Sequence, residues 1–152
     1  MRLIGLDVGT TGCKAVVFDL EGRILGYGFE EYGIITGEPA MAEQDPEAVW
    51  NAVCRVLRRA SVEAADKEPG GEPIAALSLS VQGDAVIPVD RNAKPLHNAV
   101  LGMDYRSQPQ AELCARRFGA RRLFRCTGMR PHPINALVKM LWLKQERPEA
   151  FT

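Results

Sequence analysis

Short apolar runs separated by glycine and polar residues fill the first third of the chain. The runs Leu3–Leu6 and Ala15–Phe18 flank a turn rich in glycine and threonine. A third run extends from Arg23 or Ile24 to about Tyr32, after a turn at Glu21-Gly22. Runs of this length that are bounded by turn residues are typical of β-strands. Because the three runs follow one another closely, the pattern predicts three antiparallel strands.

A helix and a further strand are predicted next. Asp45 and Pro46 indicate a helix start, with a capping carboxylate followed by proline at the first helical position. To about Ala65, apolar residues recur at helical spacing, namely Val49, Val53, Val56, Leu57, Ala60 and Ala64. After a Pro/Gly loop, the run Ile74–Val81 is too apolar for a half-exposed strand. A strand reached through a helical crossover pairs in parallel. If its partner is the first strand, Asp7 and Asp84 emerge at the same edge of the sheet.

The remainder of the chain mixes short strands and helices. The pattern predicts a strand at Val86–Val89, a turn, and a strand at His97–Leu101. A helix is expected from Ser107 to Gly119, with a second short helix that ends near Gly128. A last helix starts near Asn135, ends before Pro148 and carries an apolar stripe of Leu137, Val138, Leu141 and Trp142. Trp50 and Trp142 are both expected to pack in a core.

Composition indicates a globular chain without an overall electrostatic field. Its 152 residues are 46% hydrophobic, which fits one domain with a core, and 19 basic residues balance 19 acidic ones. This balance argues against nucleic-acid or anionic-membrane binding. The basic stretch is therefore interpreted as a solvated helical face formed by Arg116, Arg117, Arg121, Arg122, Arg125 and Arg130.

The cysteines and histidines give no sign of a metal site. Four cysteines lie scattered without CxxC spacing, and His97 and His132 are isolated, so no role is assigned to them. There is no signal-peptide pattern and no apolar run near ~18 residues, so we expect a soluble, cytoplasmic protein without a membrane span.

Candidate chemistry is concentrated in the first turn. Asp7 stands at the end of an apolar strand, where a charge is costly unless it is paired. Gly9, Thr10, Thr11 and Lys14 follow, and amides, hydroxyls and an ammonium can wrap a phosphate while the carboxylate holds magnesium or its waters. The alternative is a plain β-hairpin in which glycines serve the turn and the carboxylate caps loop amides. A strand follows this turn, whereas the GxxxxGK[ST] phosphate loop would need a helix there.

Several segments together resemble one family. "DVGTTGCKAVVFDLEGRIL" resembles the first phosphate-binding hairpin of the FGGY carbohydrate kinases, which belong to the actin, Hsp70 and hexokinase superfamily with ribonuclease H-like lobes. "AEQDPEAVW", "LSLSVQGDA", "GMDYR" and "TGMRPHPINALVKMLWLKQERPE" resemble further family segments, in the family's order. The resemblance implies an α/β fold with a mixed sheet flanked by helices.

The resemblance also implies roles for single residues. Asp7 would organise magnesium and ATP, while the residues that face the transferring phosphate would be Gly9, Thr10, Thr11 and Lys14. The residues at the sugar site would be Gln82, Gly83, Asp84, Asp104 and Arg106. Two departures leave the sugar open: Gly102 stands where the family often has tryptophan, and "VQGDA" matches neither the typical xylulose kinase nor the typical glycerol kinase sequence.

The implied activity is ATP-dependent phosphorylation of a sugar or polyol hydroxyl, of the xylulose kinase type. Residues 1–152 would form the N-terminal domain. The catalytic base and the adenosine-binding lobe are expected beyond residue 152, so no catalytic residue is assigned here and the fragment alone is expected to be inactive. A homodimer of the full-length protein is left open. The alternatives are an actin- or Hsp70-like nucleotide switch, which needs no sugar-site residues, and a non-catalytic sugar sensor.

Overall fold

The computed structural model describes residues 1–151, which form two compact units. The first unit contains Met1–Gly33 and Glu47–Gln82, and the second contains Ile34–Pro46 and the chain from Gly83 onward. Each unit therefore combines two separate stretches of sequence.

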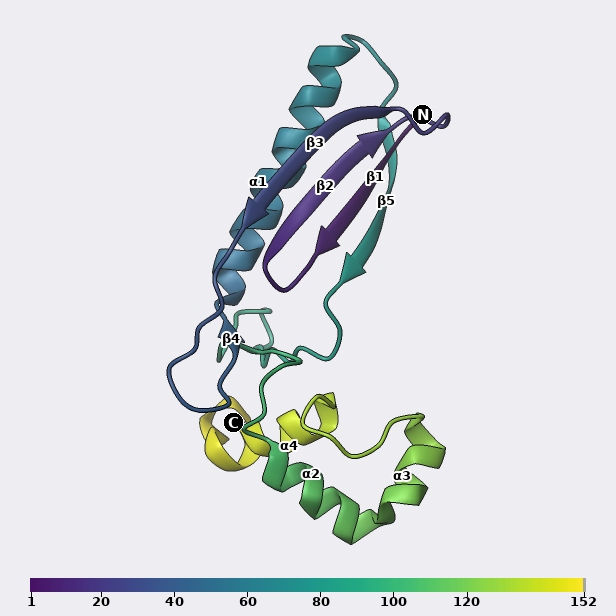
Figure 1. The fold of residues 1–152 in the computed structure, drawn as a ribbon. Coiled ribbons are helices and arrows are strands. Elements are labelled where there is room, and N and C mark those ends of the chain that lie inside the picture. Colours follow the sequence, from purple (N-terminus) through teal and green to yellow (C-terminus); the bar gives the residue numbers. More distant parts are fainter. Residues whose placement is uncertain (152) are drawn as a thin grey trace. The chain divides into compact units, whose positions relative to one another are not determined.

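A four-stranded mixed sheet forms the first unit (Figure 1). Its strands are β1 (Arg2–Val8), β2 (Gly12–Phe18), β3 (Ile24–Glu31) and β5 (Ile74–Val81), in the order β3-β2-β1-β5. β1 and β3 both pair with β2 in antiparallel fashion, and β5 pairs with β1 in parallel. The predicted antiparallel strands and the predicted parallel partner are thus confirmed.

The helix α1 (Pro46–Lys67) runs along one face of this sheet (Figure 1). Successive side chains of a strand point to opposite faces, so alternate residues of β1 and β2 meet the helix. The resulting core joins three strands to the predicted apolar stripe and contains Ile4, Leu6, Cys13, Ala15, Val17, Leu25, Ala52, Val53, Val56, Ala60 and Ala64. The helix starts at Pro46 as predicted and runs two residues past the predicted end.

Glycines in β3 let the helix backbone lie directly on the strand. A Cβ added to Gly26 would stand 1.9 Å from the carbonyl oxygen of Ala60, and one added to Gly28 would stand 2.3 Å from that of Val56. Neither carbonyl belongs to a flexible side chain. The close approach of α1 therefore depends on these two glycines.

Two predictions about burial are wrong. All residues of β5 are exposed, including Leu77 (46%), Leu79 (62%) and Val81 (62%), because β5 is an edge strand and the core beneath α1 contains no residue from it. Trp50 is 63% exposed, because it lies off the stripe that α1 presents to the sheet.

The second unit combines a small sheet with helices. β4 (Glu43–Gln44) pairs antiparallel with β6 (Ala99–Val100). The predicted strand pair is reduced to β6 and two isolated bridges, Val86 to Val100 and Val89 to Pro95. The helices are α2 (Gln108–Cys114), a π-helical turn (Ala115–Gly119), α3 (Ala120–Thr127), α4 (Ala136–Glu146) and a final 3-10 turn (Pro148–Phe151).

The helix boundaries in this unit are as predicted. The helix after Ser107 continues through the π-helical turn and ends at Gly119, which has φ of 79° and precedes α3, and Gly128 ends α3 in a left-handed conformation. Asn135 precedes α4 as predicted, but Leu137 is 51% exposed while Lys139 is buried. The six arginines of the basic stretch are exposed, as expected for a solvated face. Among residues 1–151, no helix is long and apolar enough to cross a bilayer.

Replacing Gly26 with alanine should destabilise the protein, because the added methyl group would be forced against the backbone of α1. We expect a loss of about 1–3 kcal/mol in the free energy of unfolding, measured by urea denaturation. Gly33→Ala is the matched control, since no atom lies within 4 Å of its added Cβ. Equal unfolding midpoints for the two variants would contradict the close approach.

Candidate functional site

The pairing of β1 with β2 places Asp7 directly opposite Lys14. The parallel pairing with β5 places Ser80 beside Asp7 on its other flank. Both charged residues are exposed, and by alternation they lie on the face of the sheet opposite α1. They line a hollow of about 280 Å³ together with Gly5, Leu6, Val16, Phe18, Ser78, Leu79 and Ser80. One carboxylate, one ammonium group and serine hydroxyls thus share one open surface.

The turn between β1 and β2 is closed by its own backbone. The amide of Gly9 donates to the carbonyl oxygen of Gly12 at 2.9 Å. A Cβ on Gly12 would stand 2.7 Å from the carbonyl oxygen of Glu30, so this glycine is required by close packing. Thr11 is exposed and Thr10 is half-buried in the same turn.

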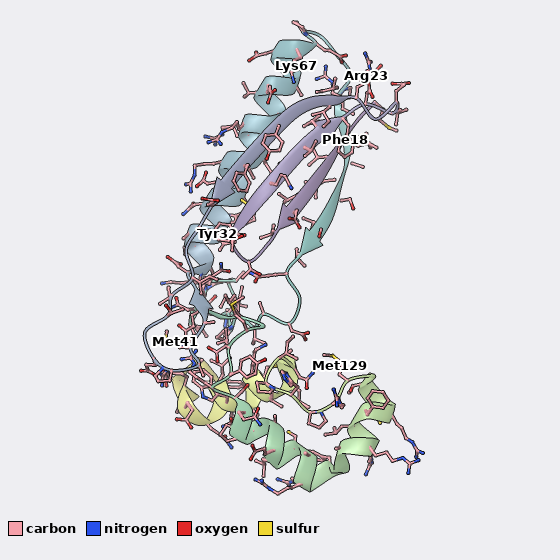
Figure 2. The ribbon with its side chains drawn as sticks, in the orientation of Figure 1. Phe18, Arg23, Tyr32, Met41, Lys67 and Met129 are labelled. Carbon is pink, nitrogen blue, oxygen red and sulfur yellow. The ribbon has the colours of Figure 1, made fainter. Side chains whose placement is uncertain are left out.

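Tyr32 supports this turn, and sequence reasoning did not single it out. It follows β3 directly (Figure 2), its hydroxyl donates to the carbonyl oxygen of Gly9 at 2.7 Å, and its amide donates to that of Thr11 at 3.2 Å. Burial raises the pKa of Tyr32 from 10.0 to about 12, with smaller contributions from Cys13 and Asp7. In the sequence, its only mark is its position directly after the strand that pairs with β2.

The donor set of the first unit fits a magnesium ion that is bound together with a polyphosphate. Asp7 offers one exposed carboxylate, and residues 1–151 contain no group of three or more His, Cys, Asp or Glu side chains that could hold a metal alone. Magnesium is usually held by one or two carboxylates, waters and the phosphates of a substrate. Lys14 and the turn would supply the positive charge and hydrogen-bond donors that phosphates require.

The residues after β5 are divided between the two units. In the first unit, the amide of Gln82 donates to the carbonyl oxygen of Val8 at 2.9 Å, so the ends of the parallel strands lie side by side. In the second unit, Gly83 is exposed, and Asp84 adopts a left-handed conformation with φ of 57°. Within the described part of the chain, no hydrogen bond or ion pair to the Asp84 carboxylate is found. This carboxylate is therefore open to an external donor.

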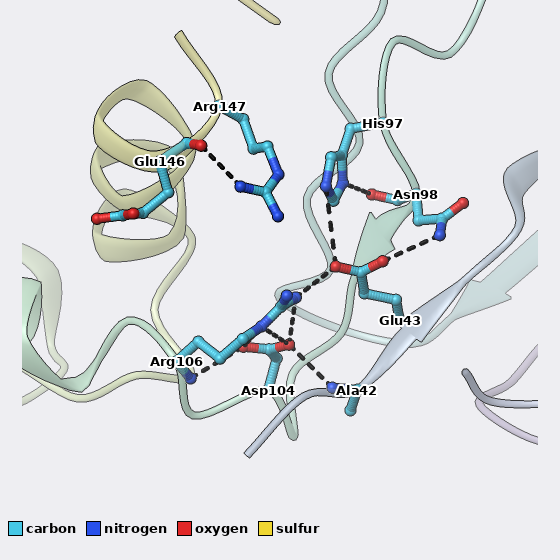
Figure 3. Close-up of polar contacts among 8 residues, drawn as sticks. All are labelled: Ala42, Glu43, His97, Asn98, Asp104, Arg106, Glu146 and Arg147. Atoms are coloured by element: carbon cyan, nitrogen blue, oxygen red, sulfur yellow. Dashed lines mark hydrogen bonds and ion pairs between the residues drawn. The ribbon is translucent and has the colours of Figure 1, made fainter. Parts of the chain in front are cut away.

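Asp104 and Arg106 lie in a buried polar network (Figure 3). Asp104 is 0% exposed, and its carboxylate accepts hydrogen bonds from the amides of Ala42 (2.9 Å) and Arg106 (3.0 Å) and from Nε of Arg106 (2.9 Å). The Arg106 guanidinium also donates to Glu43. Together these contacts hold the loop that precedes α2 against β4.

Further side chains complete this network. Asn98 donates to Glu43 at 2.9 Å, and the guanidinium of Arg106 lies 4.3 Å from the ring centroid of Trp142. Burial opposes the charge of Arg106, but hydrogen bonds and charges of Asp104 and Glu43 raise the pKa of Arg106 overall. The sequence indicated neither Glu43 nor Trp142 as a partner of Arg106. The pair of Asp104 and Arg106 is therefore an internal support, not a surface ion pair.

Lys139 is a second buried charge in the second unit. It is 0% exposed, and its ammonium group donates to the backbone carbonyl oxygens of Asp84 (2.8 Å) and Ile134 (2.6 Å). Burial lowers the pKa of Lys139, while the charges of Asp84 and Asp104 oppose this shift. The sequence did not indicate Lys139, because only the structure shows that its position lies on the buried face of α4.

Tyr32→Phe should remove an ionisation near pH 12. In the folded protein the tyrosine keeps its proton above the pH at which it loses it in the unfolded chain, so its contribution to stability is full below about pH 10 and is lost as pH rises toward 12. The difference between the phenolate absorbance of the two proteins should titrate at about 12. Titration at about 10 would contradict the buried contact.

Asp104→Asn should destabilise the protein by about 3–5 kcal/mol, because it takes one of its two carboxylate partners from the buried Arg106 charge. The free energy of unfolding from urea denaturation measures this effect. Asp66→Asn, at an exposed position of α1, is the control and should change stability by less than about 0.5 kcal/mol. A loss at position 104 no larger than the control's would refute the network's role.

Comparisons with known proteins match nearly the whole chain to one family. Residues 2–152 match the family model described as "FGGY family of carbohydrate kinases, N-terminal domain". Gluconokinase from Bacillus licheniformis is 30% identical over 147 residues, which cover 97% of this chain and 28% of that protein. Glycerol kinase from Thermococcus gammatolerans is 33% identical over 146 residues, which cover 96% of this chain and 29% of that protein.

A solved structure agrees with these relatives. The ligand-bound xylulose kinase from Lactobacillus acidophilus has a TM-score of 0.85 and 30% identity, over 99% of this chain and 29% of that one. The chain thus spans less than a third of the length of these relatives. The predicted α/β fold, a mixed sheet with flanking helices, is confirmed.

Proposed function

Because the chain belongs to the FGGY family of carbohydrate kinases, we propose that the protein containing it transfers the terminal phosphate of ATP to a hydroxyl group of a sugar or polyol. The observation that carries this proposal is the pairing of Asp7 with Lys14 beside a Gly/Thr turn, on the sheet face opposite α1. Phosphoryl transfer needs positioning and charge neutralisation more than covalent chemistry from the protein. An exposed cation, carboxylate and turn suit that demand.

The first unit would handle the phosphate. We assign the ammonium of Lys14 and the hydroxyls of Thr10 and Thr11 to phosphate oxygens. Gly9, whose amide is bonded within the turn, would let the phosphate come close to the backbone. Asp7 would hold magnesium or its waters. When bound, magnesium neutralises charge on the phosphates. Tyr32 would keep the turn in shape through its bond to the Gly9 carbonyl.

Sugar recognition is assigned to the residues that follow β5. Gln82, Gly83 and Asp84 would line the sugar site, where the open carboxylate of Asp84 can accept hydrogen bonds from hydroxyl groups. We propose that Asp104 and Arg106 support the sugar site. The full burial of Asp104 favours holding the loop from within over direct contact with the sugar.

For the substrate we propose a ketopentose of the xylulose type. Support comes from the fold match to a ligand-bound xylulose kinase over 99% of the chain. Gluconate and glycerol are the competing candidates, because gluconokinase and glycerol kinase are similarly close in sequence. We also propose that residues 1–152 form the N-terminal domain and that the catalytic base and the adenosine-binding lobe lie elsewhere in the full-length protein.

Full-length protein should release ADP from ATP and magnesium in a sugar-dependent manner, with D-xylulose tested beside D-gluconate and glycerol. Asp7→Asn and Lys14→Ala should each lower kcat by about 100-fold or more, since each removes charge stabilisation of the transferring phosphate. Asp66→Asn and Lys144→Ala, at exposed positions in helices, are matched controls and should keep wild-type kcat.

Other outcomes of this assay would overturn the proposal. ADP release that does not depend on the sugar would indicate a nucleotide switch. No ADP release with any substrate, despite sugar binding, would indicate a sensor. Preference for gluconate or glycerol would contradict only the ketopentose assignment.

A further inference from the structure

Outside the turn between β1 and β2, the most unusual buried group is the ammonium of Lys139. The side chain is 0% exposed and is the largest fully buried side chain in the described part of the chain. A lysine is seldom fully buried, because its charge loses the hydration that water provides. The contacts of the Lys139 ammonium must therefore offset the loss of its hydration.

The ammonium bonds to two backbone carbonyls instead of forming a close ion pair. One carbonyl belongs to Ile134, just before α4, and the other to Asp84, at 2.6 Å and 2.8 Å respectively. The bonds connect a helix to a loop that lies 55 residues earlier in the sequence. Lys139 therefore fixes the position of the Asp84 backbone relative to the start of α4.

The backbone of Asp84 requires such a restraint. Its φ of 57° lies in the left-handed region, which a residue with a Cβ adopts at an energetic cost. Such a conformation persists when surrounding contacts determine it, and these conformations are common at binding sites. The bond from Lys139 to the Asp84 carbonyl is a contact of this kind.

The carboxylates of Asp84 and Asp104 differ in their contacts. Asp104 is engaged by Arg106 and by the amide of Ala42, so its charge is already compensated. The carboxylate of Asp84 has no hydrogen-bond partner within residues 1–151, although it interacts electrostatically with Lys139. The lysine thus holds the main chain of Asp84 while leaving the carboxylate open.

We propose that Lys139 is a positioning residue for carbohydrate binding: its ammonium locks Asp84 in the left-handed conformation that presents the carboxylate to a sugar hydroxyl. This inference rests on the proposed function, because it deepens the role given there to Asp84. It predicts that loss of the ammonium weakens sugar recognition while nucleotide recognition is kept.

The test uses full-length protein and the variant Lys139→Met, which has similar length but no charge. We expect the KM for the best substrate among D-xylulose, D-gluconate and glycerol to rise about 10- to 100-fold, because displaced contacts weaken recognition by such factors. The KM for ATP should change by less than about 2-fold, because among the described residues the ammonium bonds only to Asp84 and Ile134, and neither is assigned to the phosphate. Calorimetric titration with the same three compounds should show a matching loss of affinity without turnover.

A double-mutant cycle separates positioning from general stability. If the lysine acts through Asp84, Lys139→Met should add less than about 3-fold to the sugar KM once Asp84→Asn is present. Lys144→Met, an exposed position of the same helix, is the control and should leave both KM values unchanged. Lys139→Gln, which retains an N–H donor on a shorter chain, should show an intermediate sugar KM.

Three results would overturn the inference. The first is an equal rise in the KM for sugar and for ATP, and the second is an effect of Lys139→Met that persists undiminished beside Asp84→Asn. The third is failure of both Lys139 variants to fold, which would make the lysine a stability residue. The wild-type protein keeps the two proposals distinct. If the wild type releases ADP in a sugar-dependent manner and the Lys139 variants are unaffected, only this inference is refuted. If the wild type shows no sugar-dependent ADP release, the proposed function is refuted.

Discussion

The alternation of side chains along β1 and β2 decides what each face of the sheet can do. Apolar residues such as Ile4 and Val17 meet α1, while Asp7 and Lys14 point to the opposite face as direct cross-strand neighbours. A slip of one residue in this register would turn both charges under the helix and expose the core. The same register that builds the core therefore also builds the candidate phosphate site, and the parallel partner β5 adds serine hydroxyls to it.

The second unit depends on buried charges that are satisfied internally. Asp104, Arg106 and Glu43 form one hydrogen-bonded network. Lys139 donates to the backbone carbonyl oxygens of Ile134 and Asp84. Removing one member of such a network leaves another buried group unpaired, so each residue is tightly constrained. The carboxylate of Asp84 differs because its backbone is held while its oxygens stay open. Rigid surroundings with one open acceptor are suited to binding a hydroxyl-rich ligand.

Much of the first unit could be predicted from the sequence, because strand alternation, the Pro46 helix start and the crossover rule are local signals. The exposure of β5 could not, since an apolar strand carries no mark of which neighbours cover it. In the second unit, the pairing of Glu43 with Arg106 spans 63 residues, so no local pattern indicates it. The candidate residues were found through motifs, but Tyr32 and Lys139 act through backbone carbonyls, and such contacts leave no pattern in the sequence.

The most direct test of the central claim is a crystal structure of the full-length protein with magnesium and a non-hydrolysable ATP analogue. We predict that the Lys14 ammonium lies within hydrogen-bond distance of a phosphate oxygen, and that the Asp7 carboxylate contacts magnesium or one of its waters. A nucleotide whose phosphates bind elsewhere, with both side chains left in solvent, would contradict it.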